Sequence, residues 1–346
     1  MSETDKTGGD EAFEAETPEL ENTATDASSP ENAAPDDASA NDASAEDAPT
    51  TRAGFVALIG APNAGKSTLL NAAVGSKVSI VTHKVQTTRA LVRGIAIHDQ
   101  SQIVFVDTPG IFAPKRRLDR AMVTTAWSGA QDADLIALLI DARRGLNEEV
   151  EVILERLSTY PKSRPRILIL NKVDVTKRES LLGLAAAANE KVNFDRTFMV
   201  SALTGSGLDD FLDYVAGTMP EGPWLYPEDQ MSDLPLRWIA AEITREKLMI
   251  RLHEELPYAS TVETEQWLET PKGARIEQTI YVERDSQRKI VLGQGGQTIK
   301  AISTAARKEI SEMLGRPAHL FLFVKVRENW SNDPERYREM GIEFPR

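Results

Sequence analysis

Short apolar runs alternate with amphipathic stretches from Gly54 onward. The apolar runs are nearly continuous and of strand length, which is typical of strands covered by helices on both faces. They occupy residues 55–59, 103–106, 135–140, 167–170 and 198–200. The stretches with helical spacing between them are 67–74, 118–130, 148–157, 180–190 and 208–218. This alternation predicts a doubly wound, mostly parallel α/β sheet, whose ligands bind at the carboxyl ends of the strands.

The pattern breaks after residue 219, where four prolines and a glycine fall within sixteen residues. We interpret residues 221–235 as a linker between a first domain, 52–220, and a smaller α+β domain, 236–346. In the second domain, helical spacing covers 236–253 and 297–314, and strand-like runs cover 260–268, 276–282 and 319–326. A glycine-rich turn precedes the second of these helices.

The first 51 residues have a different composition. Residues 1–50 hold fifteen of the 53 acidic side chains but only one of the 40 basic ones. A segment so charged and so poor in aromatic side chains predicts a disordered acidic tail, 1–51. The net charge of −13 therefore comes from the tail, and the remaining chain, with 38 acids and 39 bases, is close to neutral. An overall acidic charge thus does not argue against a polyanionic partner.

Two absences in the sequence limit the function classes. The 346 residues include no cysteine, which excludes disulfides, thiolate metal sites and a cysteine nucleophile. No apolar run reaches the roughly 18 residues of a membrane span, and the N-terminus lacks the pattern of a secretory signal. We expect a cytoplasmic protein.

Residues 60–67, Gly-Ala-Pro-Asn-Ala-Gly-Lys-Ser, fit the phosphate-binding motif G-x-x-x-x-G-K-[ST]. The motif follows a predicted buried strand and opens a predicted helix, so backbone amides and the helix N-terminus can face an anion. We expect Lys66 to reach the β- and γ-phosphates and the Ser67 hydroxyl to bind Mg²⁺. The nucleotide contacts expected from this loop are Ala61, Asn63, Ala64, Gly65, Lys66, Ser67 and Thr68.

The choice of base rests on a second segment, because this loop serves ATPases and GTPases alike. Asn171, Lys172 and Asp174 follow a predicted strand, at the carboxyl edge of the sheet. A carboxylate at 174 can accept two hydrogen bonds from guanine, whereas adenine would leave it unpaired. Ser201 and Ala202 end the last strand, where they can close over the base. A P-loop ATPase is the alternative that nucleotide competition would test.

The sequence Asp107-Thr108-Pro109-Gly110 also follows a buried strand, which places Asp107 near the metal and the amide of Gly110 near the γ-phosphate. Gln86-Thr87-Thr88-Arg89 is a candidate first switch, and we favour Thr88 as its metal ligand. The expected catalytic residues are Lys66, Thr88 and Gly110, and the expected metal ligands are Ser67, Thr88 and Asp107.

Residues Gly293-Gln294-Gly295-Gly296 fit G-x-x-G between two helical segments, a loop that KH modules use to clamp about four nucleotides of single-stranded RNA. Residues 284–308 hold six bases and one acid, as an RNA-binding surface requires. The expected RNA contacts are Arg284, Arg288, Lys289, Gly293, Gln294, Gly295, Gly296, Lys300 and Arg307. The apolar residues Ile290, Val291, Leu292 and Ile299 can line a groove under the bases or belong to the core.

Together the segments GAPNAGKST, QTTR, DTPG, NKVD and VSA, with VERDSQRKIVLGQGGQTIKAI and FVKVRENW, resemble the translation-factor-related GTPases and, among these, the Era family. The resemblance spans residues 53–330. It implies a GTPase domain and a type II KH domain, binding of GTP, GDP and Mg²⁺, and the 3′ end of 16S ribosomal RNA as partner. It also implies a role in assembly of the small (30S) ribosomal subunit, and it allows peripheral association with the inner face of the membrane.

Three positions modify what the resemblance implies. Ile111 stands where many GTPases carry a water-orienting glutamine, which predicts slow intrinsic turnover. Asn63 matches an asparagine that helps to bind K⁺ in related GTPases. Gln294 replaces the usual lysine of the G-x-x-G loop, which predicts weaker, less salt-dependent RNA binding. We expect a monomer without a DNA partner; the alternative is a regulatory GTPase whose second domain binds a protein or membrane surface.

Overall fold

The computed structural model describes residues 50–161 and 163–345. All but two residues of the predicted acidic tail, 1–51, lie outside the described residues. Among those described, no helix is long and apolar enough to cross a bilayer.

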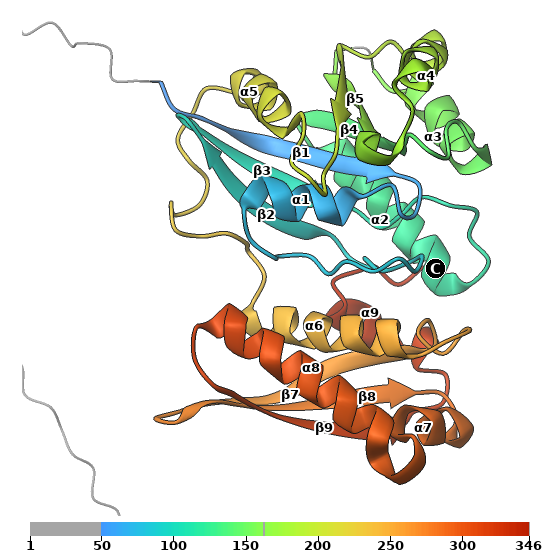
Figure 1. Ribbon diagram of the computed structural model, residues 1–346, viewed down its shortest axis with the longest axis vertical. Coiled ribbons are helices and arrows are strands. Elements are labelled where there is room, and N and C mark those ends of the chain that lie inside the picture. The colour runs from blue at the N-terminus through green and yellow to red at the C-terminus, as the bar shows by residue number, and fades with distance from the viewer. Residues whose placement is uncertain (1–49, 162, 346) are drawn as a thin grey trace, which may run out of the picture. The chain divides into compact units, whose positions relative to one another are not determined.

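Six strands form the first sheet, in the order β2-β3-β1-β4-β5-β6 (Figure 1). Five of them run parallel, and β2 pairs antiparallel with β3. The central strands are buried along nearly their whole length, as the continuous apolar runs predict. The strands are β1 (Arg52–Gly60), β2 (Val92–His98), β3 (Ser101–Asp107), β4 (Leu135–Asp141), β5 (Arg166–Asn171) and β6 (Arg196–Val200).

Helices cover both faces of this sheet. Side chains of α1 and α5 pack on one face, and side chains of α2, α3 and α4 pack on the other. The predicted doubly wound α/β fold is confirmed. The helices are α1 (Lys66–Val74), α2 (Arg117–Asp132), α3 (Glu148–Ser158), α4 (Arg178–Lys191) and α5 (Leu208–Thr218).

The edge strand β2 was not among the predicted strands. Its sequence, Val-Arg-Gly-Ile-Ala-Ile-His, contains a glycine and charged or exposed positions, so it lacks the continuous apolar run of a central strand. Gly94 lies so close to α1 that a Cβ there would approach a methyl carbon of Leu70 to 2.6 Å. The glycine that obscures the strand in the sequence therefore allows the helix to pack on it.

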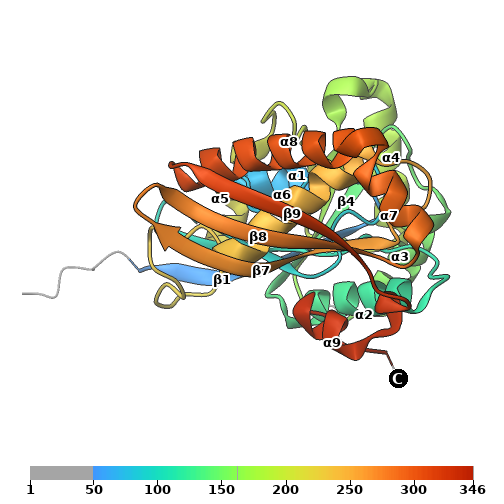
Figure 2. The same cartoon turned by 90° about the horizontal axis from the view of Figure 1, so that it is seen from below.

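The second domain contains a three-stranded sheet in the order β7-β8-β9, in which β7 and β8 are antiparallel and β8 and β9 parallel. Helices α6 and α8 pack on one face of it (Figure 2). Chain order is α-β-β-α-α-β. The elements are α6 (Leu236–Arg251), β7 (Ser260–Thr270), β8 (Gly273–Val282), α7 (Asp285–Leu292), α8 (Gln297–Leu314) and β9 (Ala318–Val326).

The C-terminal helix α9 (Pro334–Glu339), which was not predicted, lies beside α2 of the first domain. Tyr337 and Ile342 share a buried apolar cluster with Leu118 and Met122 of α2. The chain beyond β9 therefore packs against the first domain.

The segment 221–235 lies along the edge of the first sheet. Leu225 and Tyr226 donate their backbone amides to Gln102 Oε1, at 2.8 and 2.9 Å. The amide of Ile95 in β2 donates to the carbonyl of Met231 at 2.9 Å, and Arg93 forms an ion pair with Asp233. The segment predicted as a linker is thus bonded to β2 and β3.

Candidate functional site

The loop between β1 and α1 can only be formed with glycine at two positions. Gly60 has φ +154°, and a Cβ there would lie 2.4 Å from the carbonyl oxygen of Leu139. Gly65 has φ +102°, and its Cβ would lie 2.1 Å from the Asn171 side-chain nitrogen. The loop is therefore packed tightly against β4 and the Asn171 segment, and its geometry is fixed by the absence of side chains.

Lys66 is buried at the start of α1, and its ammonium donates to the carbonyl oxygens of Gly60 and Ala61, both at 3.1 Å. Burial lowers the pKa of Lys66 to about 8, although the nearby Asp107 carboxylate favours the charged form. A cation with little hydration next to the free amides of a helix N-terminus is suited to bind an anion.

The three predicted metal ligands come together at the end of β3. Ser67 Oγ donates to Asp107 Oδ2 at 2.6 Å, and Thr88 Oγ1 donates to the same oxygen at 3.2 Å. Ser79, which the sequence analysis missed, donates to it at 2.9 Å. Burial raises the pKa of Asp107, while Lys66 and the three hydroxyls oppose this shift.

Asp107 Oδ1 is buried and has no hydrogen-bond partner in the described part of the chain. A buried carboxylate oxygen without a partner beside two or three hydroxyls is the kind of oxygen set that Mg²⁺ prefers. The residues present therefore fit a magnesium ion, with Ser67, Thr88 and Asp107 as the residues that would hold it.

The two neighbouring threonines of the first switch differ in their partners. The Thr88 hydroxyl lies 3.0 Å from the Ser67 hydroxyl, whereas the Thr87 hydroxyl bonds to Thr82 and to the carbonyl of Lys84. The structure thus brings Thr88, and not Thr87, to the predicted metal site.

Gly110 approaches the phosphate loop closely, because a Cβ there would lie 2.9 Å from the Cα of Pro62. The next residue, Ile111, donates its amide to the carbonyl of Gly60 at 3.1 Å, and its side chain is buried in the core. An apolar side chain that points into the core cannot orient an attacking water.

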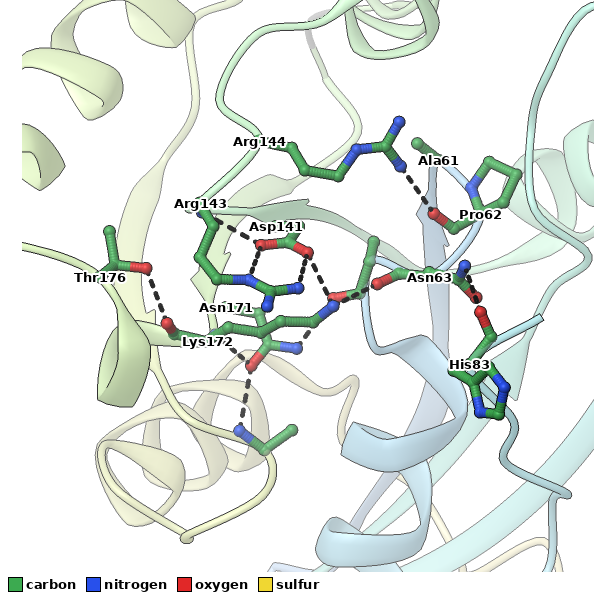
Figure 3. A network of polar contacts seen from close by, with 12 residues as sticks. Ala61, Pro62, Asn63, His83, Asp141, Arg143, Arg144, Asn171, Lys172 and Thr176 are labelled. Carbon is green, nitrogen blue, oxygen red and sulfur yellow. Dashed lines mark hydrogen bonds and ion pairs between the residues drawn. The ribbon is translucent and has the colours of Figure 1, made fainter. Parts of the chain in front are cut away.

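The base-binding segment after β5 is bonded to the phosphate loop (Figure 3). Asn171 Nδ2 donates to the carbonyl of Ala64 at 2.9 Å, and Asn171 Oδ1 accepts from the amide of Ala202 at 3.0 Å. Lys172 has φ +66° and donates to the carbonyl of Asn63 at 2.6 Å. The two motifs therefore form one rigid unit.

Asp174, the residue expected to choose the base, is exposed to solvent. Its Oδ1 accepts a hydrogen bond of 2.6 Å from Ser201 Oγ, which in turn accepts from the amide of Thr204 at 3.2 Å. Ser201 thereby orients the carboxylate. The predicted Ser201–Ala202 pair is thus brought to both Asn171 and Asp174.

Asp141, at the end of β4, was missed by the sequence analysis. Its Oδ2 accepts from Lys172 Nζ at 2.7 Å and from Arg143 at 2.9 Å (Figure 3). Burial alone would favour the neutral acid, but Arg143 and Lys172 outweigh it and lower the pKa of Asp141 to about 2. The sequence contained a signal for it, because a lone Asp ends a buried strand at the same sheet edge as the other site residues.

A cavity of about 470 Å³ opens between the phosphate loop, the first switch and the loop after β4. This volume suits a small-molecule ligand. Its wall includes Lys66, Ser67, Thr88, Gly110 and Lys172. It also includes Thr68, which follows Ser67 in α1.

Residues 77–89, which we call the switch segment, bond to the second domain. Arg245 of α6 donates to the carbonyl of Thr87 at 2.5 Å, and Arg89 donates to the carbonyl of Ser260 at 3.1 Å. Glu246 accepts from the amide of Val81 at 2.9 Å. The metal-site residue Thr88 thus lies between two residues bonded to the second domain, a connection that the sequence analysis did not predict.

The G-x-x-G loop joins α7 to α8. Gly293, Gly295 and Gly296 all have positive φ, of +74°, +58° and +77°. A Cβ on Gly293 would lie 2.2 Å from Thr298 Oγ1, whereas a Cβ on Gly295 or Gly296 would meet nothing within 4 Å. The first glycine is required by packing, and the other two leave backbone open to a ligand.

The predicted RNA-contacting bases are all exposed, but they differ in position. Arg288 and Lys289 lie in α7 before the loop, each 3.5 to 3.6 Å from the Asp285 carboxylate. Lys300 lies in the first turn of α8. Arg307 is ten residues beyond the start of that helix, about 15 Å along its axis. The structure therefore does not bring Arg307 to the loop.

The four apolar residues that could line a groove or belong to the core differ in burial. Val291 is fully buried in the core of the second domain, whereas Ile290 is 57% exposed. Leu292 and Ile299 are partly exposed. Three of the four are thus available near the loop, and one belongs to the core.

A phosphate loop joined to a guanine-type base segment, followed by an α-β-β-α-α-β domain, defines a P-loop GTPase with a C-terminal KH domain of type II. Family models agree: residues 55–172 match the model described as 50S ribosome-binding GTPase, and residues 255–331 match the KH domain.

Comparison with individual proteins is more specific. The chain is 71% identical to GTPase Era of Sinorhizobium medicae and of Rhizobium meliloti, over 297 residues, 86% of this chain and 95% or 94% of theirs. It is 38% identical to an Era variant of Aquifex aeolicus bound to GDP and aluminium fluoride, with a TM-score of 0.79 over 84% of this chain and 99% of that one. An Era bound to MgGDPNP and nucleotides 1506–1542 of 16S ribosomal RNA matches equally well. The chain belongs to the Era family of GTPases.

Proposed function

We propose that this GTPase is a GTP-controlled factor that binds the 3′ end of 16S ribosomal RNA and acts in assembly of the 30S subunit. In this proposal residues 52–220 bind and hydrolyse GTP, residues 221–235 connect the two domains, and residues 236–346 bind single-stranded RNA. The support is the open glycine loop between α7 and α8, together with the related Era whose complex contains that RNA.

For the nucleotide, the proposed roles are supported by the contacts of the phosphate loop, the end of β3 and the segment after β5. Lys66 neutralises charge on the β- and γ-phosphates, aided by the amide of Gly110, and Asp174 selects guanine. A Mg²⁺ ion held by Ser67, Thr88 and Asp107 would supply further charge neutralisation at the phosphates. Because Ile111 is buried, no side chain at that position orients water, so hydrolysis depends on positioning and electrostatics and is expected to be slow.

For RNA, the open glycines carry the proposal. A Cβ added at Gly295 or Gly296 would meet no protein atom within 4 Å, so a sugar–phosphate chain can approach the backbone there. The N-terminus of α8 favours a phosphate at this position. Arg288, Lys289 and Lys300 are exposed positive side chains within a few residues of the loop, and Arg284 lies at the far end of α7.

The test is RNA binding after an acid is placed in the loop. Gly295→Asp, alone or with Gln294→Asp, should lower affinity for a single-stranded oligonucleotide of the 16S 3′ end by on the order of 100-fold, because the acid repels phosphate. Gly315→Asp is the matched control: Gly315 ends the same helix, also has positive φ, and also has open space around it. Equal affinity of the two single variants would refute the RNA-binding role of the loop.

We further propose that the switch segment couples the two domains. The residues on both sides of Thr88 are bonded to the second domain, Thr87 to Arg245 and Arg89 to Ser260, so a displacement of this backbone would disturb those bonds. Arg245→Ala should therefore reduce the difference in RNA affinity between the GTP- and GDP-bound proteins. A difference equal to that of the unaltered protein would exclude this route.

Three finer points are also proposals. A K⁺ ion near Asn63 would make turnover faster in potassium than in sodium buffer, and equal rates would exclude it.

We propose a cytoplasmic monomer, which sedimentation would test. Peripheral membrane association is proposed from the family resemblance alone, and failure to co-sediment with anionic lipid vesicles would exclude it.

A further inference from the structure

Four bases gather around the first turn of α2, on the first domain. Lys115, Arg116, Arg117 and Arg120 are all exposed. Within residues 50–161 and 163–345, none of them forms an ion pair. We call these four residues the α2 basic surface. It is separate from the G-x-x-G loop, which belongs to the second domain.

This placement opposes the local stability of the helix. Positive side chains at a helix N-terminus are unfavourable, because the helix dipole is positive there. The single acid of the turn, Asp119, is buried and accepts from the amides of Lys115 and Arg116, at 3.1 and 2.9 Å. Since helix stability does not account for four bases at this position, a binding role is the better explanation.

The surface also has a rigid support. Leu118 and Met122 of α2 are buried against Tyr337 and Ile342 of the C-terminal segment, and the guanidinium carbon of Arg117 lies 5.0 Å from the ring centroid of Phe344. Figure 2 shows α2 beside α9 and on the opposite side of the view from α8. Arg117 and Arg120 therefore project from a packed helix, and Lys115 and Arg116 from the residues directly before it, which Asp119 holds through their amides.

We propose that the α2 basic surface binds the phosphate backbone of double-helical ribosomal RNA, as a second RNA contact of this protein. The inference rests on the proposed function, because it assumes that ribosomal RNA is the partner. Guanidinium groups pair with phosphate in a bidentate manner. The surface has no open glycine loop, and the aromatic ring beside it, Phe344, is already covered by the Arg117 guanidinium. This favours backbone contacts over stacking on single-stranded bases.

The surface is also connected to the nucleotide site. Asp119 Oδ1 accepts from Gln86 Nε2 of the switch segment at 3.3 Å, while its Oδ2 holds the amides of Lys115 and Arg116. Lys115 follows Gly110 by only five residues. RNA bound at the surface would therefore lie close to Gln86 of the switch segment and to the residues that follow Gly110.

The test is binding of a structured RNA and of a single strand by the same variant. Arg116→Ala with Arg117→Ala should lower affinity for a fragment of the 16S 3′ domain that contains double helices by about tenfold. It should also flatten the slope of log affinity against log salt by about 2, since two phosphate contacts are lost. Lys177→Ala with Arg178→Ala, which removes the same charge from exposed positions at the start of α4, is the control and should change neither.

The single-stranded 3′-end oligonucleotide separates this inference from the proposed function. Unchanged oligonucleotide affinity with weakened binding of the structured fragment supports the α2 basic surface. Unchanged binding of both RNAs overturns it. Weakened binding of 30S subunits with unchanged binding of the structured fragment also overturns it, in favour of a protein contact. If Gly295→Asp leaves oligonucleotide affinity intact, the proposed function fails by itself.

Discussion

The nucleotide site and the G-x-x-G loop are both rich in glycine, but they are built in opposite ways. At the nucleotide site, Gly65 is enclosed, and its neighbours Lys66 and Asp107 are buried and bonded to other parts of the chain. At the G-x-x-G loop, Gly295 and Gly296 are open, and the nearby bases are exposed.

This difference indicates different kinds of selectivity. A site made of buried, mutually bonded polar groups is organised before its ligand arrives and rejects a ligand that leaves one group unpaired. A loop made of open backbone and solvated charge tolerates many sequences and depends on salt. The following predictions separate the two sites, from the largest expected effect to the smallest.

Replacing the buried cation should have the largest effect. Lys66→Ala removes the charge that neutralises the phosphates, so we expect GTP hydrolysis to fall by on the order of 10³-fold in a single-turnover assay. Circular dichroism should remain unchanged, because the variant also removes the cost of burying an ammonium. Hydrolysis within tenfold of the unaltered protein would contradict the assignment.

Changing the base-selecting carboxylate should alter specificity. Asp174→Asn replaces an acceptor with a donor, which suits the C2 carbonyl of xanthine. We expect the ratio of GTP to xanthosine triphosphate affinity to fall by on the order of 10²-fold, measured by competition. If ATP, and not the xanthine nucleotide, gains affinity, the role of Asp174 is wrong.

Replacing one glycine of each loop by alanine compares directly how tightly the two loops are enclosed. Gly65→Ala would collide with Asn171, so we expect nucleotide binding to be lost. Gly295→Ala meets open space in the protein, and its positive φ costs only about 1 kcal/mol of folding free energy. Because the added methyl group would stand only between the backbone and RNA, we expect RNA affinity to fall by no more than roughly fivefold. Calorimetry for nucleotide and anisotropy for RNA would measure both, and equal sensitivity would mean that the two sites are not built differently.

The smallest expected effect is an increase in RNA affinity. Gln294→Lys adds one cation to the loop, so we expect RNA affinity to rise by about threefold at low salt, with a salt slope steeper by about 0.7. Nucleotide affinity should stay constant. An unchanged salt slope would show that residue 294 does not contact phosphate.

The sequence predicted the elements that are locally encoded. Continuous apolar runs identified β1, β3, β4, β5 and β6, and several of the motifs at their ends lie together around one cavity. Edge strand β2 was missed because an edge needs neither continuous apolar character nor a large residue at Gly94.

What could not be predicted depends on contacts between distant segments. Ser79 and Asp141 join the site only because folding brings their loops to the sheet edge, and neither lies in a known motif. The bonds of Arg245 and Glu246 to the switch segment depend on how two domains meet. Arg307 lies about 15 Å along α8 from the loop, a separation that the charge density along the sequence does not reveal.

The segment 221–235, which lies along β2 and β3, has a consequence for solubility. An edge strand with free amides and carbonyls can recruit strands of other molecules and begin aggregation. Here the amide of Ile95 already donates to the carbonyl of Met231, and Ser232 forms an isolated antiparallel β-bridge with Gly94. The connection between the domains thus also covers part of the β2 edge of the sheet, and we expect a protease cut within it to expose that edge.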